Sequence, residues 1–393
     1  MSAAYDVVIA GGAVTGSSAA YHLAAHPGFG GRVLVVEKDP SYQFCASALS
    51  AASIRQQYST EINVRISLYG IRFLRAVGEI LAVDGEAPEI GLHEGGYLFL
   101  ASAAGRPVLE ANHRLQAGLG ADIALLGPEG LRARFPWLNT EGLALGSLGV
   151  SGEGWFDGYG LMQAFRRKAR ALGVDYRAGS VAEVRREGGR VTGVVLADGS
   201  RIACGALVNA AGGGGAALAR AAGIEIPVRN RKRMIFTFTC ADPVERAPLL
   251  IDPTGLYFRP EGRGFLCGLQ PPADRDPDAD GDFEVEHDFF DSRIWPILAG
   301  RVPAFERIRP GRAWAGHYDM NLFDHNAIVG PVPGLAGFYL ANGFSGHGLQ
   351  QSPAIGRGLA ELIVDGGYRS LDLSPLSFAR IAAGAPLREA NVV

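Results

Sequence analysis

The nine residues from Asn342 to Gln350, NGFSGHGLQ, are of the types that let a chain come close to a ligand. They follow a predicted strand at Phe338–Ala341 and precede a predicted helix at Pro353–Val364. The three glycines let the backbone approach a ligand, because no Cβ atom blocks the way. Unpaired N–H groups in the first helical turn favour negative charge. A reduced flavin, anionic at N1 and O2, would exploit this arrangement, and a glycine-rich turn without a ligand is the alternative.

The other end of the chain carries a second glycine turn. The segment Asp6–Gly16, DVVIAGGAVTG, is an apolar run followed by glycines, and a helix is expected over Ser17–Ala25. It matches the dinucleotide fingerprint G-x-G-x-x-G except that Ala13 replaces the middle glycine. A second predicted strand, Arg32–Val36, leads to Glu37, where a carboxylate would accept a ribose hydroxyl bond. This order predicts a Rossmann-type nucleotide site, against an ordinary βαβ unit without a nucleotide.

Composition narrows the functional class. The 393 residues suffice for two domains, and the net charge of −3 gives no basic excess for nucleic acid or an anionic membrane. Four cysteines are scattered without a C-x-x-C pair, which argues against structural zinc, any other metal site and a disulfide framework. The N-terminus lacks the pattern of a cleaved signal, so we expect reduced thiols and a cytoplasmic protein. Uncharged stretches are broken by glycine and proline, so no membrane span is expected.

Apolar periodicity predicts the remaining elements. Expected helices are Tyr58–Leu81, Arg106–Leu119, Pro128–Pro136, Tyr159–Leu172 and Asp291–Val302. Expected strands are Gly96–Ala101, the hairpin Val181–Glu187 with Arg190–Ala197, Ala206–Asn209, Arg233–Cys240, Gly255–Arg259, Gly264–Leu269 and Gly311–Asn321. The Asp/Pro-rich segment Pro271–Gly281 predicts a mobile surface loop. The uncharged stretch His325–Gly356 predicts burial around a large neutral ring system.

Motifs from both chain ends resemble those of the D-amino-acid oxidase (DAO) superfamily of FAD-dependent oxidoreductases, which includes glycine oxidase, monomeric sarcosine oxidase and dimethylglycine dehydrogenase. They are the N-terminal fingerprint with Glu37, the segment Val208–Gly212 and the segment Gly343–Gly348, and the similarity extends from Asp6 to about Arg380. Further motifs resemble the subfamily containing the mitochondrial FAD-dependent oxidoreductase that assists respiratory complex I assembly. These motifs are Gly154–Asp157, Lys232–Arg233, Gly255–Arg259, His287–Phe290, Ala313–Tyr318, Gly346–Gln351 and Asp372–Pro375.

The resemblance implies an α/β fold of the DAO/glutathione-reductase-2 type, with a Rossmann-type FAD-binding domain and an α+β substrate domain built on an antiparallel sheet. The FAD-binding domain would comprise residues 1–90, 150–225 and 322–393, and the substrate domain residues 91–149 and 226–321. The implied cofactor-binding residues are Gly11, Ala13, Val14, Gly16, Glu37, Lys38, Ser50, Ala51, Ser53, Val181, Ala211, Gly212, Gly213, Gly316, Gly346, His347, Gly348, Leu349 and Gln350.

Two of these positions carry further expectations. Val181 would meet the adenine, or it is simply a core valine of the hairpin. Gly316 stands where monomeric sarcosine oxidases have the cysteine that bonds the flavin, so non-covalent FAD is expected.

Flavin-dependent amine oxidation needs a neutral nitrogen and an α C–H bond facing flavin N5, so the protein chiefly supplies orientation and electrostatics. Arginine suits a carboxylate anchor because its fork is bidentate. Arg55 aligns with a carboxylate-binding arginine of sarcosine oxidases. The alternative is a helix-surface arginine paired with Glu61. Gln350 stands where those enzymes have a second, cationic anchor, and its amide would bond a carboxylate or an amide.

Three more residues complete the expected catalytic set. Tyr257 and Arg259 alternate on a strand and therefore share one face. The alternatives are a sheet aromatic for Tyr257 and a surface charge for Arg259. His317 or Tyr318 is expected beside the flavin ring, whereas His347 would shape the flavin pocket.

The sequence therefore predicts FAD-dependent oxidation of the C–N bond of a small secondary amine or amino acid, with hydride passing to flavin N5 and the imine hydrolysed. The alternatives are a 2-hydroxy-acid dehydrogenase of the same fold and an FAD-containing assembly or binding protein without turnover. The expected partners are a carboxylate-bearing amine and an electron acceptor, which is a quinone, an electron-transfer protein or oxygen. Leu266 aligns with a lysine that promotes oxygen reaction, so a dehydrogenase is expected over an oxidase, unless Arg263 serves instead.

Overall fold

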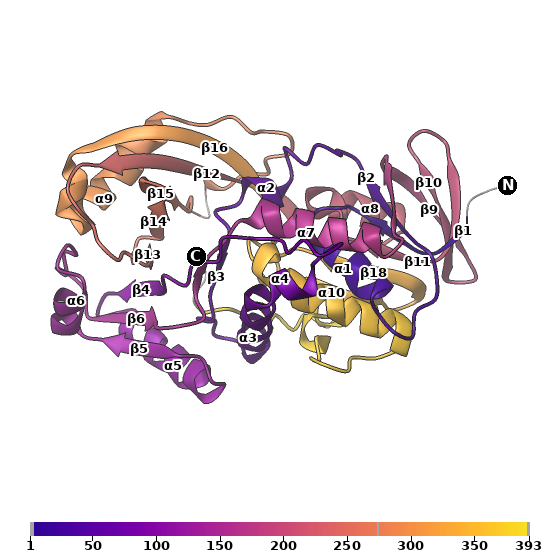
Figure 1. Cartoon of the computed structure of the whole chain (residues 1–393), viewed down its shortest axis with the longest axis horizontal. Helices are drawn as coiled ribbons and strands as arrows, with labels where there is room; N and C mark the ends of the chain where they lie inside the picture. The colour runs from indigo at the N-terminus through magenta and orange to yellow at the C-terminus, as the bar shows by residue number, and fades with distance from the viewer. Residues whose placement is uncertain (1–3, 273–274, 391–393) are drawn as a thin grey trace.

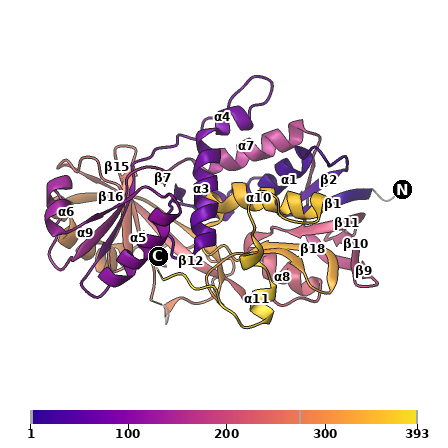
Figure 2. The ribbon, with the colours of Figure 1, turned by 90° about the horizontal axis from the view of Figure 1, so that it is seen from below.

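Two eight-stranded sheets organise the chain into two lobes (Figures 1 and 2). The computed structural model describes residues 4–272 and 275–390. Strands of the first lobe, the nucleotide lobe, are β1 (Ala4–Ala10), β2 (Val33–Glu37), β8 (Asp175–Ala178), β9 (Val181–Glu187), β10 (Arg190–Leu196), β11 (Arg201–Asn209), β17 (Ile328–Val332) and β18 (Leu335–Asn342). Their order is β17-β18-β10-β11-β1-β2-β8, with β9 beside β10, and β18 also pairs with β11. Because β1 runs parallel to both β2 and β11, the predicted Rossmann-type unit is confirmed.

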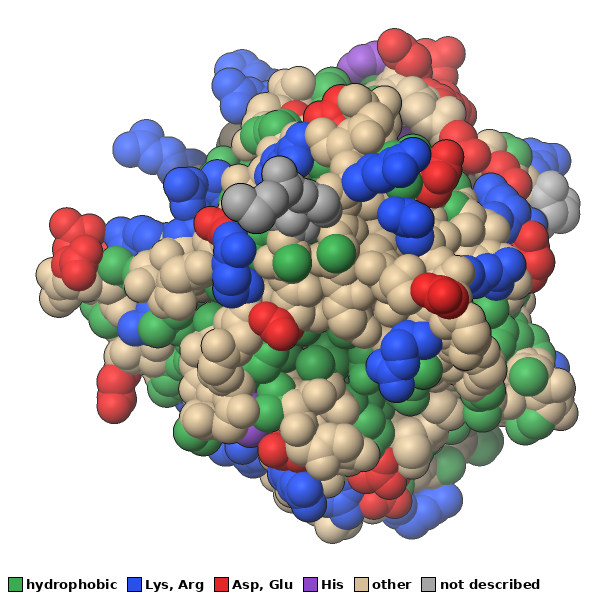
Figure 3. Space-filling view, turned by 90° about the vertical axis from the view of Figure 1, so that its right-hand side faces the viewer, with side chains coloured by type: hydrophobic (Ala, Val, Ile, Leu, Met, Phe, Trp, Pro, Cys, Tyr) green, Lys and Arg blue, Asp and Glu red, His purple; other side chains and the backbone are tan. Residues whose placement is uncertain are grey.

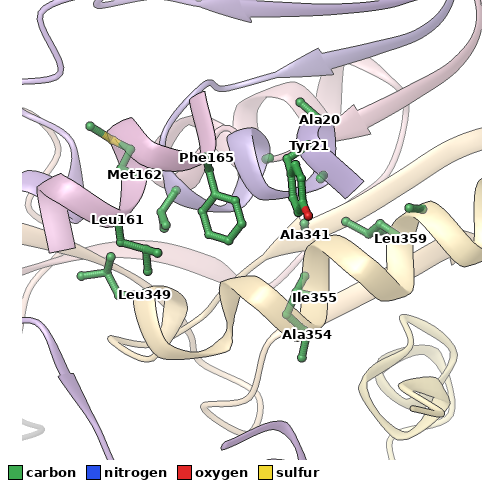
Figure 4. Packing of buried hydrophobic residues seen from close by; sticks show 14 of the residues in the cluster. Ala20, Tyr21, Leu161, Met162, Phe165, Ala341, Leu349, Ala354, Ile355 and Leu359 are labelled. Atoms are coloured by element: carbon green, nitrogen blue, oxygen red, sulfur yellow. The ribbon is translucent and has the colours of Figure 1, made fainter. Parts of the chain in front are cut away.

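Helices cover both faces of the nucleotide lobe's mixed sheet, whose central strands are parallel. One face carries α1 (Val14–Ala24), α3 (Glu61–Arg75), α7 (Gly158–Ala171) and α10 (Gly348–Asp365), and the other carries α8 (Gly215–Ala221). Val7 and Ile9 of β1 enter the first core and Val8 enters the second. Burial on both faces explains why this strand reads as an unbroken apolar run. In Figure 4, side chains of α7 and α1, including Phe165 and Tyr21, point toward α10.

The second lobe holds the other sheet, in the order β16-β12-β15-β14-β13-β4-β6-β5. Its strands are β4 (Tyr97–Ala101), β5 (Ile123–Leu126), β6 (Leu145–Gly149), β12 (Val228–Cys240), β13 (Leu249–Ile251), β14 (Leu256–Glu261), β15 (Gly264–Leu269) and β16 (Ile308–Asn321), and its helices are α5 (Arg106–Gly118), α6 (Pro128–Arg134) and α9 (Trp295–Arg301). Every pairing is antiparallel except β13 with β4. One face buries Phe236, Phe238 and Phe258 against Leu298 and Phe305. On the opposite face, Phe99 and Ala101 pack with Leu109 of α5, and Tyr97 and Tyr257 line a ligand cleft.

Several boundaries differ from those expected. The remaining short elements are α2 (Ala46–Leu49), α4 (Val77–Ile80), α11 (Ala379–Ala382) and the strand pair β3 (Ser53–Ile54) with β7 (Gly154–Trp155). The helix expected over Tyr58–Leu81 is two helices, α3 and α4. The one expected over Asp291–Val302 begins as the π-helix Phe290–Ile294 and continues as α9.

The last long helix begins at Gly348, not at Pro353 as expected, so Pro353 lies inside α10. Proline has no N–H to donate to the carbonyl oxygen four residues earlier, that of Leu349. The hydroxyl of Ser352 donates to this oxygen instead (Oγ to O, 2.9 Å). A local side-chain bond therefore lets the helix start five residues earlier than the proline signal indicated.

Surface features agree with the charge balance. In Figure 3 acidic and basic side chains are interspersed over the face shown. No helix in the described parts of the chain is long and apolar enough to cross a lipid bilayer. The four cysteines are not joined by disulfides.

The segment near the C-terminus is fastened to the nucleotide lobe by buried charges. Arg380 forms a two-point ion pair with Asp324 (Nε to Oδ2, 2.8 Å; Nη2 to Oδ1, 3.0 Å). Glu389 accepts from Ser59 N (2.7 Å) and Asn63 Nδ2 (2.6 Å). These bonds tie the end of the chain to the start of α3.

Replacing Arg380 with methionine should lower the free energy of unfolding by about 3–5 kcal/mol, because Asp324 would keep a buried charge without its partner. A urea titration measures the loss. The matched control is Arg32→Met, since Arg32 pairs with Asp175 on the surface with both side chains more than half exposed, and it should cost at most about 1 kcal/mol. Equal losses in the two variants would contradict the role of the buried pair.

Candidate active site

The first glycine turn lies where β1 meets α1. Gly11 has φ +99°, and a Cβ atom there would lie 2.3 Å from the carbonyl oxygen of Ala210. This position therefore requires glycine. Ala13 has φ −71°, which any residue adopts, so the backbone tolerates alanine in place of the fingerprint's middle glycine. Val14 and Gly16 are buried in the first turn of α1.

Glu37 ends β2 beside this turn. Its carboxylate accepts from Gly12 N (Oε2, 2.7 Å) and Asp39 N (Oε1, 2.8 Å). Lys38 is exposed next to it. Val181 begins β9 two residues after Gly179, whose N–H donates to Glu37 O (2.9 Å), so Val181 lies near the same strand end. These residues gather where the resemblance would put the adenosine.

The carboxyl ends of β1, β11 and β18 meet at one edge of the sheet. Ala210 N donates to Ala10 O (2.9 Å), and Asn342 Nδ2 donates to Asn209 Oδ1 (3.2 Å). Ala211, Gly212 and Gly213 follow as a turn that opens α8. A crevice at the ends of neighbouring parallel strands is where open α/β sheets bind ligands. The residues present fit FAD, because two glycine turns form a cradle that a Cβ at Gly11 would fill.

A cleft of about 840 Å³, partly open to solvent, continues from this edge to the free face of the second sheet. It is lined by Ser50, Ala51, Ala52, Ser53, Arg55, Tyr97, Arg233, Met234, Leu249, Ile251, Gly255, Tyr257, Leu269, Gln270, Tyr318, Ser345, Gly346, His347, Leu349 and Gln350. The charged lining residues among those described are two arginines, with no aspartate or glutamate. The cleft therefore favours an anionic ligand.

Arg55 is the cleft's unpaired cation. Its side chain is buried, with the residue only 3% exposed, and among the described residues no carboxylate forms an ion pair with it. Its Nη2 lies 3.0 Å from His347 Nε2, its guanidinium lies over the rings of Tyr58 (4.5 Å) and Phe99 (5.3 Å), and its Nε has no partner. Glu61, the alternative partner, pairs with Arg65 instead. Arg55 is thus not a surface arginine.

His347 supports Arg55 as a neutral acceptor. Burial, the charge of Arg55 and His325 hold the pKa of His347 well below its usual range. Guanidinium only donates, so Nε2 of His347 accepts and the ring proton is on Nδ1. Gln350 is oriented similarly, since its Oε1 accepts from Arg55 N (3.0 Å). Its amide NH₂ is then the donor available to a ligand.

Three tyrosines from the second sheet face these groups. Burial raises the pKa values of Tyr97, Tyr257 and Tyr318, so all three hydroxyls stay protonated. Tyr97 Oη and Ser53 Oγ are 3.0 Å apart. Gly346 has φ +92°, and a Cβ there would lie 2.3 Å from the Tyr318 ring. Contact with that ring is what requires glycine in the 346 turn.

Two residues expected in the active site lie outside the cleft lining. His317 projects away from it, because alternate residues of a strand face opposite sides. Its Nε2 lies 2.7 Å from Asp282 O and its ring stacks on Phe283 (4.2 Å), so its neighbour Tyr318 is the residue that lines the cleft. Arg259 shares the strand face of Tyr257 but lies outside the lining, where it pairs with Glu261 and donates to Ala51 O (Nη2, 2.7 Å).

The other predicted positions fall at or near the lining. Ser50, Ala51, Ser53, Gly346, His347, Leu349, Gln350, Arg55 and Tyr257 line the cleft, and Gly348 begins α10 between them. Gly316 lies against Leu49, where a Cβ would be 2.9 Å away, directly before Ser50. Non-covalent attachment of the flavin stays a prediction.

Several lining residues were missed. Tyr97 stands in no motif, and Arg233 belonged to a motif used only for the family resemblance. Two lining residues other than glycine, Ala52 (φ +45°) and Ser345 (φ +51°), have left-handed backbones. Such strain gathers at ligand sites, but no sequence pattern signals it.

A buried carboxyl group supports the segment that carries Arg55. Glu153 is fully buried, and it accepts from Gln56 N (2.5 Å), Gln57 N (3.1 Å) and Gln57 Nε2 (2.8 Å). Burial raises its pKa from 4.5 to about 7, although these bonds and the charge of Arg55 act in the opposite direction. Glu153 therefore changes charge near neutral pH.

Replacing Gly11 with alanine should reduce FAD content, because the new Cβ would displace the Ala210 turn from the cradle. We expect at least about tenfold weaker FAD binding, since a non-glycine residue at this φ is strained and also clashes. The ratio of flavin to protein absorbance after dialysis measures it. Gly30→Ala is the control, because nothing lies within 4 Å of a Cβ there. Full FAD content in Gly11→Ala would contradict the assignment.

Glu153 should make the protein less stable as pH rises from about 4.5 to about 7. In this window the folded state keeps a proton on Glu153 that the unfolded state has lost. The contribution of Glu153 to the free energy of unfolding therefore falls by about 1.4 kcal/mol per pH unit. Urea titrations at pH 5, 6, 7 and 8 should show a shallower fall in Glu153→Gln than in the parent protein. Parallel curves would mean that Glu153 does not titrate in this range.

Comparison with known proteins agrees with this geometry. A family described as FAD dependent oxidoreductase (DAO) matches residues 6–362. FAD-dependent oxidoreductase domain-containing protein 1 of Xenopus laevis is 42% identical, over 99% of this chain and 85% of that protein. Mitochondrial sarcosine dehydrogenase of Mus musculus is 26% identical, over 92% of this chain and 40% of that protein.

Solved structures share the fold. The L-proline dehydrogenase of P. horikoshii superposes with a TM-score of 0.84 at 24% identity, covering 98% of this chain and 100% of that one. Glycine oxidase of Geobacillus kaustophilus superposes with a TM-score of 0.82 at 23% identity, covering 96% of this chain and 99% of that one. These likenesses confirm the predicted fold class.

Proposed function

Because the chain belongs to the DAO family of FAD-dependent oxidoreductases, we propose that it oxidises the C–N bond of a small secondary amine or amino acid that carries a carboxylate. The observation that supports this proposal is the buried guanidinium of Arg55, which faces the cleft without a carboxylate partner. A buried cation is costly unless it is paired. A ligand carboxylate supplies the missing partner.

The lining residues orient such a ligand. Arg55 holds the carboxylate, Gln350 donates from its amide NH₂, and the ring of Tyr257 bounds the opposite wall. Bound FAD supplies the acceptor for the hydride. The positive lining disfavours a protonated amine and so lowers the amine's pKa. His347 is engaged with Arg55, so the described lining offers no free general base, and the neutral amine is the form that binds.

The open cleft favours turnover over a purely structural flavin. A site that keeps FAD only for structure has no need of a solvent-connected cavity beside an unpaired arginine. Oxidation of a 2-hydroxy acid would use the same anchor and stays the alternative. Sarcosine dehydrogenase and L-proline dehydrogenase, by their names, act on amines that bear carboxylates, which supports the amine.

We retain a dehydrogenase over an oxidase as part of the proposal, but its sequence argument is weaker than expected. Leu266 is buried opposite Arg259 in the sheet and does not line the cleft. Arg263, the alternative, is exposed. Arg259, which pairs with Leu266 across the sheet, reaches the cleft margin, where its guanidinium donates to Ala51 O. Turnover with oxygen against turnover with an artificial quinone is the measurement that decides.

Replacing Arg55 with alanine should abolish anaerobic flavin reduction by carboxylate-bearing amines while FAD content stays normal. Loss of a buried partner for the carboxylate costs about 2–5 kcal/mol, or roughly 30- to several-thousand-fold in kcat/KM. Arg55→Lys should restore little, because one ammonium cannot reproduce the fork. A panel of N-methyl and D- or L-amino acids provides the substrates.

Arg65→Ala is the matched control, since Arg65 is exposed and pairs with Glu61 on the surface of α3. It should reduce flavin at the parent rate. Unchanged rates in Arg55→Ala would place the anchor elsewhere. Loss of FAD in that variant would mean that Arg55 holds the cofactor.

A further inference from the structure

A second arginine lines the same cleft. Arg233 comes from β12, where its cross-strand partner on β16 is Gly316. Because Gly316 has no side chain, the guanidinium of Arg233 can lie over the ring of Tyr318, 5.4 Å from its centre. The side chain of Arg233 is only 9% exposed. A buried cation from the second lobe thus faces the cleft as Arg55 does from the first.

Arg233 differs from Arg55 because a carboxylate of the protein occupies its fork. Asp276 accepts from both ends of the guanidinium (Nη1 to Oδ1, 2.7 Å; Nη2 to Oδ2, 2.8 Å). This is the two-point geometry by which arginine binds a carboxylate ligand. Among the described residues, Asp276 is the carboxylate that ion-pairs with Arg233.

Asp276 belongs to an acidic segment that is fastened to β12 at other points as well. Asp278 pairs with Arg231 (2.6 Å) and Asp282 pairs with Lys232 (2.8 Å). These cations do not line the cleft. The segment was expected to be a mobile loop from Pro271 to Gly281, of which residues 273–274 lie outside the described residues. Asp276 itself also lies 3.9 Å from Arg231 Nε. Because Asp278 and Asp282 have ion pairs of their own, they still hold the segment when Asp276 leaves Arg233.

We propose that Arg233 is a second anion-binding residue of the cleft, and that the preferred substrate is an amine with two acidic groups, one for Arg55 and one for Arg233. The proposal rests on the proposed function for the Arg55 end. The second acidic group replaces the carboxylate of Asp276, which turns out to water. Arg233 keeps its paired hydrogen bonds through this exchange.

The exchange discriminates between substrates. A neutral substrate tail that displaced Asp276 would leave a buried guanidinium without a partner, which is strongly unfavourable. Such a substrate therefore leaves Asp276 in place and gains nothing at Arg233. The discrimination therefore comes mainly from the unpaired guanidinium that a neutral-tailed substrate would leave, and less from the contacts that a diacidic substrate makes.

Binding of non-oxidisable acids to the FAD-loaded protein tests the proposal without turnover. Acetate is the monocarboxylate probe, and succinate, glutarate and adipate span the possible separations of two carboxylates. Perturbation of the flavin absorption spectrum gives each Kd. In the parent protein at least one of the three diacids should bind about tenfold or more tighter than acetate.

Asp276→Asn should tighten that diacid by a further factor of about ten, because the competing carboxylate is gone, and should leave the Kd of acetate for the Arg55 site unchanged. Asp278→Asn is the matched control on the same segment, and it should change neither Kd. Arg233→Gln should reduce the diacid's affinity to that of acetate. The proposal can be judged from Asp276→Asn alone if Arg233→Gln does not fold.

Equal affinities of acetate and all three diacids in both the parent protein and Asp276→Asn would overturn the second subsite. Arg55→Ala separates this failure from that of the proposed function. If acetate binding depends on Arg55 and the diacids gain nothing from Asp276→Asn, only the second subsite is wrong. If acetate binds equally well to Arg55→Ala, the carboxylate anchor itself is wrong, and the second subsite falls with it.

Discussion

The rest of the site depends on one constraint: a guanidinium, that of Arg55, is buried without a carboxylate. Several groups compensate in part. His347 is neutral and accepts a hydrogen bond from Arg55, and the guanidinium lies over the ring faces of Tyr58 and Phe99. Glu153 lies one layer further back, where it fixes the backbone after Arg55 and contributes a negative charge as it ionises. The positive charge that these groups do not compensate gives the cleft an affinity for anions.

The two lobes contribute different parts of this arrangement. The nucleotide lobe supplies the glycine turns, Arg55 and the start of α10, so the cofactor cradle and the first anion site belong to the same lobe. The second sheet contributes Tyr97, Tyr257, Tyr318 and Arg233 from its free face. Its other face is closed by phenylalanines. Because the larger core lies on the face away from the cleft, the lining can vary without disturbing that core, which suits a substrate wall.

The sequence predicted those features of the site that depend on interactions between residues close together in the chain. The turn at Gly11 and the acid Glu37 depend on neighbours in sequence, and Arg55 could be placed by resemblance. Tyr97 and Arg233 could not be predicted, since their positions depend on the register of strands far apart in the chain. Either His317 or Tyr318 was expected beside the flavin ring, because strand alternation allows only one of them to face the cleft. The register of β16 selects Tyr318. Pro353 misplaced a helix start because Ser352 satisfies the carbonyl that proline leaves unpaired.

The two arginines of the cleft differ in what they require of a ligand. Arg55 is unpaired, so any carboxylate improves its surroundings, and binding there selects for charge alone. Arg233 is already paired with Asp276, so a ligand gains there only by the difference between its own acid and the protein's. The Arg55 site therefore adds affinity for any carboxylate, whereas at the Arg233 site a ligand gains affinity only if its acidic group binds better than Asp276. A cleft with both kinds of site admits carboxylate-bearing molecules in general and holds longest those whose second acid reaches across to the other lobe.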